Sequence, residues 1–401
     1  MEKKVYCIIS NSRLDINKIK LRRQRFANYL LQREDTEAVI WIYPIERSFK
    51  KVETIKNFFL GNAKIKKSSG GKLVKVGIPD SLPNFLIPKN SLTKHSLIHR
   101  RAVKDLITLL NKYPDEKVLY YTHPSFPFLT SISNWSSVVY DCSDLWSSSM
   151  SKDPGFISKL TRYFKSKSEV EILKKSDKIF ATSDFLKDEI FDKSGRKAEV
   201  IENGVDFDSF TSLNGTNSDE IDSIPKPRFG YVGGMKRKVD FENLEKLALH
   251  HPDWNIVLVG PSVSRIKEIH APLLSHKNVY AFNSIRPDEV PAYLSKIDIG
   301  LLPYRNIRYN QAVFPLKLFE YLASGIPAVG WGLPSTKKYS KEGIYYYTDE
   351  PGSIDEISKL CSKALSIAES KEFVTARKSI AEREDWDSKF DSIVKKIDTN
   401  R

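Results

Sequence analysis

The chain has 401 residues and a formal net charge of +14, and 28% of its residues are charged, which is the composition of a globular protein with room for two hydrophobic cores. Its three cysteines, Cys7, Cys142 and Cys361, are far apart and lack the spacing of a metal site or a disulfide framework, so a cytoplasmic location is expected. The first residues lack the apolar core of a signal peptide, and no apolar run is long enough to span a bilayer. Any membrane contact is therefore expected to be peripheral.

Basic residues are concentrated in residues 1–114, which contain 24 Lys or Arg and 9 Asp or Glu, a difference of +15. The rest of the chain is therefore close to neutral. A basic surface attracts anionic lipid headgroups, nucleic acid or an acidic substrate, or it is simply solvated. Because the chain carries no recognised nucleic-acid module, a peripheral contact with an anionic membrane and a plain solvated surface remain as the two interpretations.

Strand and helix patterns alternate along the chain. Apolar runs at 5–9, 38–43, 117–121, 137–140 and 177–183 predict strands, and periodic segments at 18–33, 97–113 and 156–175 predict helices. An irregular lysine-rich stretch reaches to about residue 90, and its apolar residues 58–60 and 85–87 fill a local core or lie against lipid. The polar segment 211–227 is typical of a linker, and a second α/β series follows it. This order predicts parallel sheets with right-handed crossovers.

Polar side chains follow three of the predicted strands. Ligands of open parallel sheets bind beyond the carboxyl ends of the strands, so these residues are candidates for sugar binding or acid–base chemistry. A helix cap is the alternative for Asp144, and an ordinary loop histidine is the alternative for His123. The candidates are Ser10, Asn11 and Arg13 after the first strand, His123 after the strand 117–121, and Asp141 and Asp144 after the strand 137–140.

Two segments of the second series suit a phosphate. Gly233 and Gly234 let a ligand approach the backbone, and three cations, Lys236, Arg237 and Lys238, follow at once. In the stretch 314–329, Pro315 opens a short helix that carries Lys317 and Glu320 on one face and ends at a glycine. An amphipathic helix with one surface ion pair would show the same pattern.

In this order the motifs resemble those of GT-B fold glycosyltransferases, most closely the family 4 group. Residues 177–183 resemble its "aD.vfatS" strand, residues 203–206 its "NGVD" turn, residues 230–234 its donor loop and residues 315–325 its "P.K..EYLA.G" helix. Residues 140–144 and 229–261, especially 239–241 and 251–254, are also similar to the teichuronic acid biosynthesis glycosyltransferases of Gram-positive bacteria.

The resemblance implies an α/β protein with two Rossmann-like domains facing across a cleft. Residues 1–210 would bind the acceptor, residues 228–379 would bind a nucleotide-sugar, and residues 380–401 would form a helix that crosses back to the first domain. Ser10, Asn11 and Arg13 would contact the acceptor, and Asp141, Asp144 and His123 would be catalytic. The implied donor contacts are Gly233, Gly234, Lys236, Arg237, Lys238, Gly260, Phe314, Pro315, Lys317, Leu318 and Glu320.

The implied reaction moves a sugar from a nucleoside diphosphate sugar, with uridine as the base, to a cell-envelope polysaccharide or polyprenyl-linked glycan at the inner face of the membrane. No bound metal or other cofactor is expected, because cationic side chains would neutralise the leaving diphosphate. Many family members carry a second glutamate eight positions before Glu320, where this chain has Ala312. The retaining mechanism typical of the family therefore does not carry over securely. An inverting enzyme would need a base, for which Asp141 and Asp144 are the candidates.

Two rival functions remain. A sugar-nucleotide 2-epimerase has the same architecture but needs no acceptor surface, and the basic first domain favours a transferase. A nucleic-acid-binding protein would need an aromatic stacking platform, which the sequence does not supply, so no nucleic-acid partner is expected.

Overall fold

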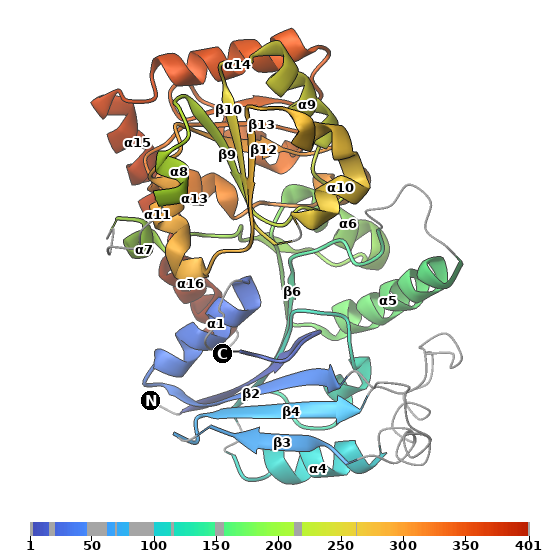
Figure 1. Ribbon diagram of the computed structural model, residues 1–401. Coiled ribbons are helices and arrows are strands. Elements are labelled where there is room, and N and C mark those ends of the chain that lie inside the picture. The colour runs from blue at the N-terminus through green and yellow to red at the C-terminus, as the bar shows by residue number, and fades with distance from the viewer. Residues whose placement is uncertain are drawn as a thin grey trace. The chain divides into compact units, whose positions relative to one another are not determined.

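The computed structural model describes residues 3–15, 21–45, 62–68, 70–79, 100–113, 116–148, 156–211, 219–261 and 263–399. The chain forms two compact units, which are described separately below (Figure 1). The first contains Met1–Ile201 and Phe390–Arg401, and the second contains Glu202–Lys389. The change of unit thus comes at residue 202, earlier than the linker predicted at 211–227.

The first unit is built on a sheet with the strand order β3-β4-β2-β1-β5-β6-β7-β8. Its pairs are parallel except for the antiparallel edge pair β3 and β4, which the sequence analysis did not predict. The chain runs outward from β1 to one side and then returns to place β5 on the other side, so β1 and β5 flank the switch point of the sheet. The strands are β1 (Lys4–Ile9), β2 (Thr36–Ile45), β3 (Lys64–Lys67), β4 (Leu73–Pro79), β5 (Lys117–Tyr121), β6 (Ser137–Cys142), β7 (Lys178–Ala181) and β8 (Glu199–Val200).

The end of the chain completes the first unit. Phe390 packs its ring 5.2 Å from that of Phe26 and 5.5 Å from that of Tyr29, and Lys4 donates to Asp398 at 2.5 Å. The last helix therefore joins the first unit as the resemblance implied, although from Phe390 rather than from residue 380. The helices are α1 (Arg22–Gln32), α4 (Arg100–Leu110), η2 (Pro127–Ser131), α5 (Phe156–Lys175), α6 (Asp184–Ser194) and the end of α16 (Trp386–Asp398).

The second unit is built on a parallel sheet with the order β11-β10-β9-β12-β13-β14. The order reverses between β9 and β12, which places the switch point between these two strands. Their residues are buried on both faces, as the continuous apolar runs predict. The strands are β9 (Arg228–Val232), β10 (Asn255–Val259), β11 (Val279–Phe282), β12 (Ile299–Pro303), β13 (Ala328–Trp331) and β14 (Tyr345–Thr348).

Short helices cover this second sheet. The residues after the linker position are part of its core, because Ile221 is fully buried and Ile224 is 2% exposed. The predicted linker is therefore wrong for residues 219–227. The helices are α7 (Phe207–Thr211), α8 (Asp219–Asp222), α9 (Phe241–His250), α10 (Ser264–His270), η3 (Ala271–Ser275), η4 (Pro287–Glu289), α11 (Val290–Leu294), α12 (Arg308–Gln311), α13 (Lys317–Ala323), η5 (Pro334–Tyr339), α14 (Ile354–Ser366) and α15 (Lys371–Arg383).

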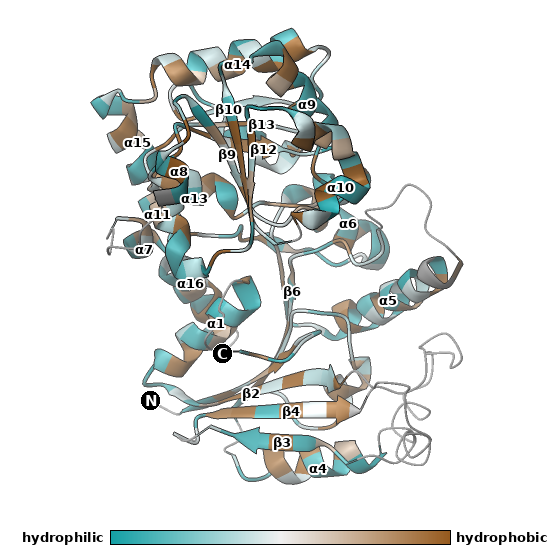
Figure 2. Cartoon of the chain, viewed as in Figure 1, coloured by the Kyte–Doolittle hydropathy of each residue, from teal (hydrophilic) through white to brown (hydrophobic). Residues whose placement is uncertain are grey.

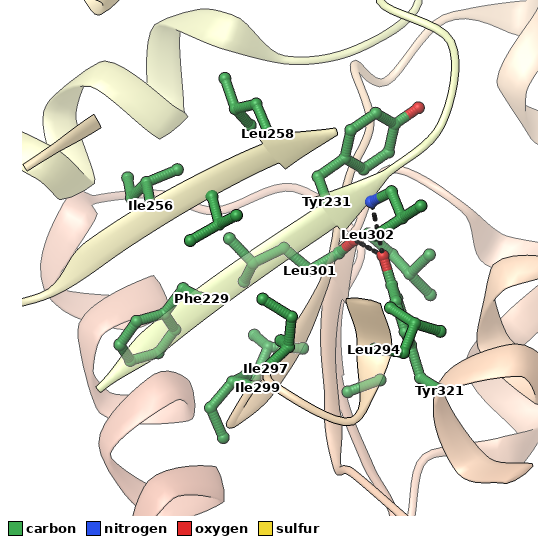
Figure 3. Close-up of a cluster of buried hydrophobic side chains, with 14 of the residues drawn as sticks. Phe229, Tyr231, Ile256, Leu258, Leu294, Ile297, Ile299, Leu301, Leu302 and Tyr321 are labelled. Atoms are coloured by element: carbon green, nitrogen blue, oxygen red, sulfur yellow. Dashed lines mark hydrogen bonds between the residues drawn. The ribbon is translucent and has the colours of Figure 1, made fainter. Parts of the chain in front are cut away.

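Tyr321 fixes helix α13 under the switch point of the second sheet. Its hydroxyl accepts from the amide of Val232 at 3.4 Å and lies 3.1 Å from the carbonyl oxygen of Leu301, so it bonds both β9 and β12 (Figure 3). Its ring fills the space that a side chain at Gly300 would need, since a Cβ there would lie 2.4 Å from the ring. The position of α13 against the ends of β9 and β12 is thus set by buried contacts.

None of the described helices is both long enough and apolar enough to cross a membrane. The apolar residues 58–60 and 85–87, for which the sequence left a local core or a lipid contact open, lie outside the described residues.

Candidate functional site

The carboxyl ends of three strands of the second sheet meet at its switch point. Gly233 follows β9, Gly260 follows β10 and Tyr304 follows β12. A crevice at such a point is where open α/β sheets bind their ligands. The predicted donor loop therefore lies at the edge of the sheet where a ligand is expected.

Gly233 and Gly260 allow two loops to approach closely. Gly260 has φ +150°, and a Cβ there would lie 2.1 Å from the carbonyl oxygen of Gly233. The amide of Gly233 donates to Val259 at 2.7 Å, which fixes its own position. At Gly234 the nearest atom to an added Cβ is 3.5 Å away, on the flexible side chain of Lys236. The backbone at Gly234 is thus open to an approaching group.

Lys317, the first residue of α13, extends its side chain over Gly233. A Cβ on Gly233 would lie 2.1 Å from Lys317 Cε and 2.5 Å from its Nζ. The ammonium also lies 5.5 Å from the centre of the Tyr231 ring. In the part of the chain that the structure describes, no carboxylate forms an ion pair with Lys317. Its charge is consequently available at the glycine loop.

Lys238 brings a second cation to the same strand ends. Its Nζ lies 5.3 Å from the centre of the Tyr304 ring and 5.6 Å from that of Tyr309. Burial raises the pKa of Tyr304, but Lys317 and Lys238 together with a hydrogen bond from Tyr231 outweigh it, so the pKa of Tyr304 is lowered. Both cations therefore act on Tyr304 at the strand ends.

Glu320 belongs to this group as well. It is half-buried on α13, three residues after Lys317, and its charge acts on Tyr304 in the direction opposite to that of the lysines. The structure thus gathers Lys317, Lys238 and Glu320 around one tyrosine, whereas Lys236 and Arg237 are exposed beside them. Tyr231 and Tyr304 were not among the predicted site residues, because buried tyrosines carry no signal in a sequence that separates them from core residues.

Three predicted donor contacts are parts of the core. Phe314 is 2% exposed and packs against Phe319 and Tyr339, Leu318 is fully buried, and Pro315 is buried. The side chains of Phe314 and Leu318 therefore belong to the core, and a donor contact by these residues, which would have to come from their backbone, stays a prediction. Helix α13 also begins at Lys317 rather than at Pro315.

The position of the missing acid is internal. Ala312 is fully buried, and so is Asn310, whose amide donates to the carbonyl oxygens of Lys238 at 3.0 Å and Arg305 at 2.7 Å. Asn310 therefore holds the backbone that presents Lys238. A side chain larger than that of alanine at residue 312 would have to fit inside the unit, which is consistent with the small residue found there.

Arg377 fixes the far end of α13. Its guanidinium is fully buried and donates to the carbonyl oxygens of Gly325 at 2.6 Å, Gly343 at 2.6 Å and Ala368 at 2.8 Å. Gly325 terminates the helix with φ +79°. Together with Tyr321, this arginine gives the helix of Lys317 and Glu320 two rigid supports.

In the first unit, the predicted acceptor residues lie at the equivalent switch point. The amide of Thr122 donates to Ile9 at 3.0 Å, so the loop of Ser10 lies beside that of His123. Asn11 and Arg13 are exposed, whereas Ser10 is fully buried. His123 is 7% exposed, its Nδ1 lies 2.6 Å from Ser125 Oγ, and Trp146 packs against its ring edge-on at 4.5 Å.

Asp141 is part of a buried ion pair. It lies within β6, which ends two residues later than predicted, and its side chain is 2% exposed. Its Oδ2 accepts from Arg22 Nε at 2.8 Å and from the Tyr120 hydroxyl at 2.9 Å. Burial alone would lower the pKa of Arg22, but the ion pair outweighs it and raises that pKa. In this structure the Asp141 carboxylate is thus engaged by Arg22 and Tyr120, and its predicted catalytic role stays a prediction.

Asp144 has a different environment. It is half-buried in the loop after β6. Burial lowers the pKa of Arg23, and the nearby Asp144 carboxylate offsets part of this effect. Because Asp144 lies beyond the end of its strand, as His123 does, it remains a candidate to act on an acceptor.

The comparisons with known proteins agree with this architecture. The chain is 34% identical over 404 residues to a protein of Bacillus subtilis (strain 168) named "Putative teichuronic acid biosynthesis glycosyltransferase TuaH", with 98% of this chain and 96% of the relative covered. The family described as glycosyl transferases group 1 matches residues 221–379. The chain belongs to the group 1 glycosyltransferases.

The fold of this glycosyltransferase is shared with solved structures. HepE of Anabaena, solved with UDP and glucose, superposes with a TM-score of 0.65 at 14% identity, over 99% of this chain and all of that one. α,α-Trehalose 6-phosphate synthase of Burkholderia multivorans superposes with a TM-score of 0.67 at 11% identity, over 100% of this chain and 97% of that one. The GT-B fold expected from the motifs is thus confirmed.

The two glycines of this glycosyltransferase should respond differently to substitution by alanine. At Gly260 the added Cβ meets backbone at 2.1 Å and φ is positive, so we expect the unfolding free energy to fall by about 2 kcal/mol. At Gly233 it meets only the end of the Lys317 side chain, so the fold should persist while that ammonium is displaced. Urea unfolding and calorimetry with UDP check this pair. Equal loss of stability in both variants would contradict the expectation.

Proposed function

We propose that this glycosyltransferase transfers a sugar from a UDP-sugar to a glycan acceptor of cell-envelope polysaccharide synthesis, such as a polyprenyl-linked teichuronic acid precursor. The observation that carries the proposal is the cationic group at the switch point of the second unit. There Lys317 lies over Gly233, and Lys238 lies across the neighbouring Tyr304. The name of the Bacillus subtilis relative supports the acceptor, and the HepE structure with UDP supports the nucleotide.

The donor would bind with its diphosphate over the glycine loop. The backbone amide of Gly234 and the ammonium of Lys317 would bind the phosphate oxygens, and Glu320 would accept hydrogen bonds from the ribose hydroxyls. In the reaction the bond between the anomeric carbon and the phosphate oxygen breaks, and UDP departs with the bonding electron pair. Lys317 and Lys238 would stabilise the negative charge that develops on that diphosphate.

The acceptor would bind to the first unit. Its hydroxyl oxygen forms the new bond to the anomeric carbon and releases its proton. In an inverting enzyme Asp144 would take this proton, and in a retaining enzyme a phosphate oxygen of the donor would take it. We propose retention, which is the usual outcome in the family, although Ala312 replaces a residue on which that outcome often relies.

Retention predicts that the product has the same anomeric configuration as the donor, which NMR of the product measures directly. Asp144→Asn should then reduce turnover by about tenfold or less, because the residue would only orient the sugar. An inverted product, together with a loss of about a thousandfold in Asp144→Asn, would instead identify Asp144 as the base.

We further propose that the protein works without a divalent cation, because two lysines already supply positive charge where the leaving diphosphate would lie. Turnover should therefore persist in the presence of EDTA, within about twofold of the untreated rate. Loss of turnover in EDTA that Mg²⁺ or Mn²⁺ restores would contradict this part of the proposal.

The basic residues of 1–114 would hold the protein at an anionic membrane, on the cytoplasmic side where its acceptor would lie. Lys64, Lys66 and Lys67 of the edge strand β3 are exposed and add positive charge to this part of the first unit. The three cysteines are free and buried, as expected of a protein in a reducing compartment.

A panel of nucleotide sugars tests the function. Calorimetry should show that UDP-sugars bind, and incubation with a polyprenyl diphosphate-linked acceptor should release UDP and extend the glycan. If a UDP-sugar were converted to its C2 epimer without acceptor, the epimerase alternative would hold. If no nucleotide sugar bound, the donor assignment would fail.

A further inference from the structure

The outward face of helix α5 (Phe156–Lys175) exposes aromatic residues in a basic setting. Phe156 is 78% exposed and Tyr163 is 56% exposed, which are the two highest values among the described large hydrophobic residues of the first unit. Leu160, one turn from Phe156, is half-buried. Residues of this size on a helix surface are normally turned toward the core. Within the described residues, nothing covers these two rings, so this face is a candidate docking surface.

Helical geometry places these residues on one face. At 100° per residue, Phe156, Leu160 and Tyr163 fall within a stripe of about 60°. Lys167 and Lys174 fall in the same stripe, and Lys159 lies at its edge; all three lysines are exposed. The inward face is marked by Ile172 and Leu173, which are fully buried. The helix thus has its core contacts on one side and a mixed aromatic and basic surface on the other. Hydrophilic and hydrophobic residues are interspersed along its ribbon (Figure 2).

The charge on this surface is mainly positive. Lys159, Lys167 and Lys174 lie on or beside the stripe and are exposed, and the nearest acidic residue, Glu171, is half-buried about 20° beyond the stripe. The ammonium of Lys167 lies 5.6 Å from the centre of the Tyr163 ring, so the cation and the aromatic ring form a single surface. Lysine stems can lie along an apolar surface while their charges reach outward.

A helix in the same unit provides the contrast. Phe191 of α6 is 52% exposed, but α6 carries four acidic residues and two lysines. The acidic residues around Phe191 are repelled by an anionic surface, which keeps this aromatic residue away from such a surface. Of these two helices, only α5 combines exposed aromatic residues with a mainly positive charge.

We propose that the outward face of α5 docks on the surface of an anionic lipid bilayer. Phe156 and Tyr163 enter the boundary between headgroups and acyl chains, and Lys159, Lys167 and Lys174 bind the anionic headgroups. An interfacial helix has these properties, with aromatic residues on one face and lysines that contact the lipid phosphates. The surface differs from the basic region of residues 1–114, and the inference does not depend on the donor or the acceptor proposed above.

Vesicle sedimentation tests this inference with the full chain. The vesicles contain phosphatidylcholine with about one third phosphatidylglycerol, and pure phosphatidylcholine vesicles serve as the neutral comparison. The wild type should bind the anionic vesicles. The double variant Phe156→Ser/Tyr163→Ser should bind them about tenfold more weakly, because two aromatic anchors are lost. Lys159→Glu/Lys167→Glu should lose about tenfold or more on anionic vesicles, because two attractive charges become repulsive.

Phe191→Ser is the control, since it removes from α6 an aromatic residue about as exposed as Tyr163 and should change vesicle binding by less than about twofold. Melting curves and affinity for UDP should be the same in all variants, because none of the substituted side chains is buried.

Several results would overturn the inference. Failure of the wild type to bind anionic vesicles would do so, as would equal binding by wild type and the Phe156→Ser/Tyr163→Ser variant. Analytical ultracentrifugation provides another test: a wild-type dimer that this variant dissociates would assign the face to a second copy of the chain instead.

Discussion

Lys317→Ala is expected to lower kcat/KM for a UDP-sugar by about a hundredfold to a thousandfold while the protein stays folded. The Lys317 ammonium lies over Gly233 at the switch point of the second sheet, and no carboxylate in the described part of the chain neutralises it. Removing a cation that faces a developing charge in a protected site costs about 3–4 kcal/mol of transition-state stabilisation. Steady-state kinetics with the wild type and the variant measure this difference.

Two comparisons locate the effect on the diphosphate. Calorimetry should show that Lys317→Ala weakens UDP far more than uridine, since uridine has no phosphate to bind. Lys359→Ala removes an exposed lysine from α14 and should change neither affinity by more than about twofold. A Lys317→Ala enzyme that bound UDP and turned over at the wild-type rate would remove the main support for the donor site.

Glu320 offers a related test within the same helix. If its carboxylate holds the ribose, Glu320→Gln should weaken UDP by about tenfold and should not weaken 2′,3′-dideoxy-UDP further. Lys317 and Glu320 would then act on different parts of one nucleotide, as their spacing of three residues on one face of α13 predicts.

Much of the second unit could be predicted from the sequence because its signals are local. The glycine pair after an apolar strand and the helix with Lys317 and Glu320 each have a recognisable pattern, and the fold then brings both to one edge of the sheet. Partners such as Tyr304 and Asn310 could not be predicted. They are buried and act through contacts with residues distant in sequence, Lys238 among them, which no short pattern records.

The first unit was harder to predict where charged residues interrupt the apolar pattern of a strand. Strand β3 reads Lys-Ile-Lys-Lys and is exposed along its length at the sheet edge, so it lacks the alternation that marks a half-buried strand. A local feature such as the cap at Ser183 is easier to predict, because its side chain accepts from the amide of Leu186, only three residues away. The ion pair of Asp141 could not be predicted for the reverse reason: its partners Arg22 and Tyr120 come from α1 and β5, far away in the chain.

Asp141→Asn is expected to lower the unfolding free energy by about 3 kcal/mol rather than to remove a catalytic group. The substitution leaves the buried charge of Arg22, whose side chain is 4% exposed, without a counter-charge. Burial and the charge of Asp141 raise the pKa of Tyr120 well above its ordinary value, so its hydroxyl stays protonated. It can therefore donate to an aspartate or to an asparagine at position 141. Urea unfolding of the variant measures the loss.

A double variant separates the ion pair from any catalytic role. Arg22→Met/Asp141→Leu removes both charges and should recover part of the stability that Asp141→Asn loses, because the desolvation of two ions is avoided. Activity should recover with it, since the pair would act only by holding α1 against β5 and β6. Asp144→Asn is the matched control, with stability within about 0.5 kcal/mol of the wild type. An Asp141→Asn protein as stable as the wild type but about a hundredfold less active would return Asp141 to the catalytic site.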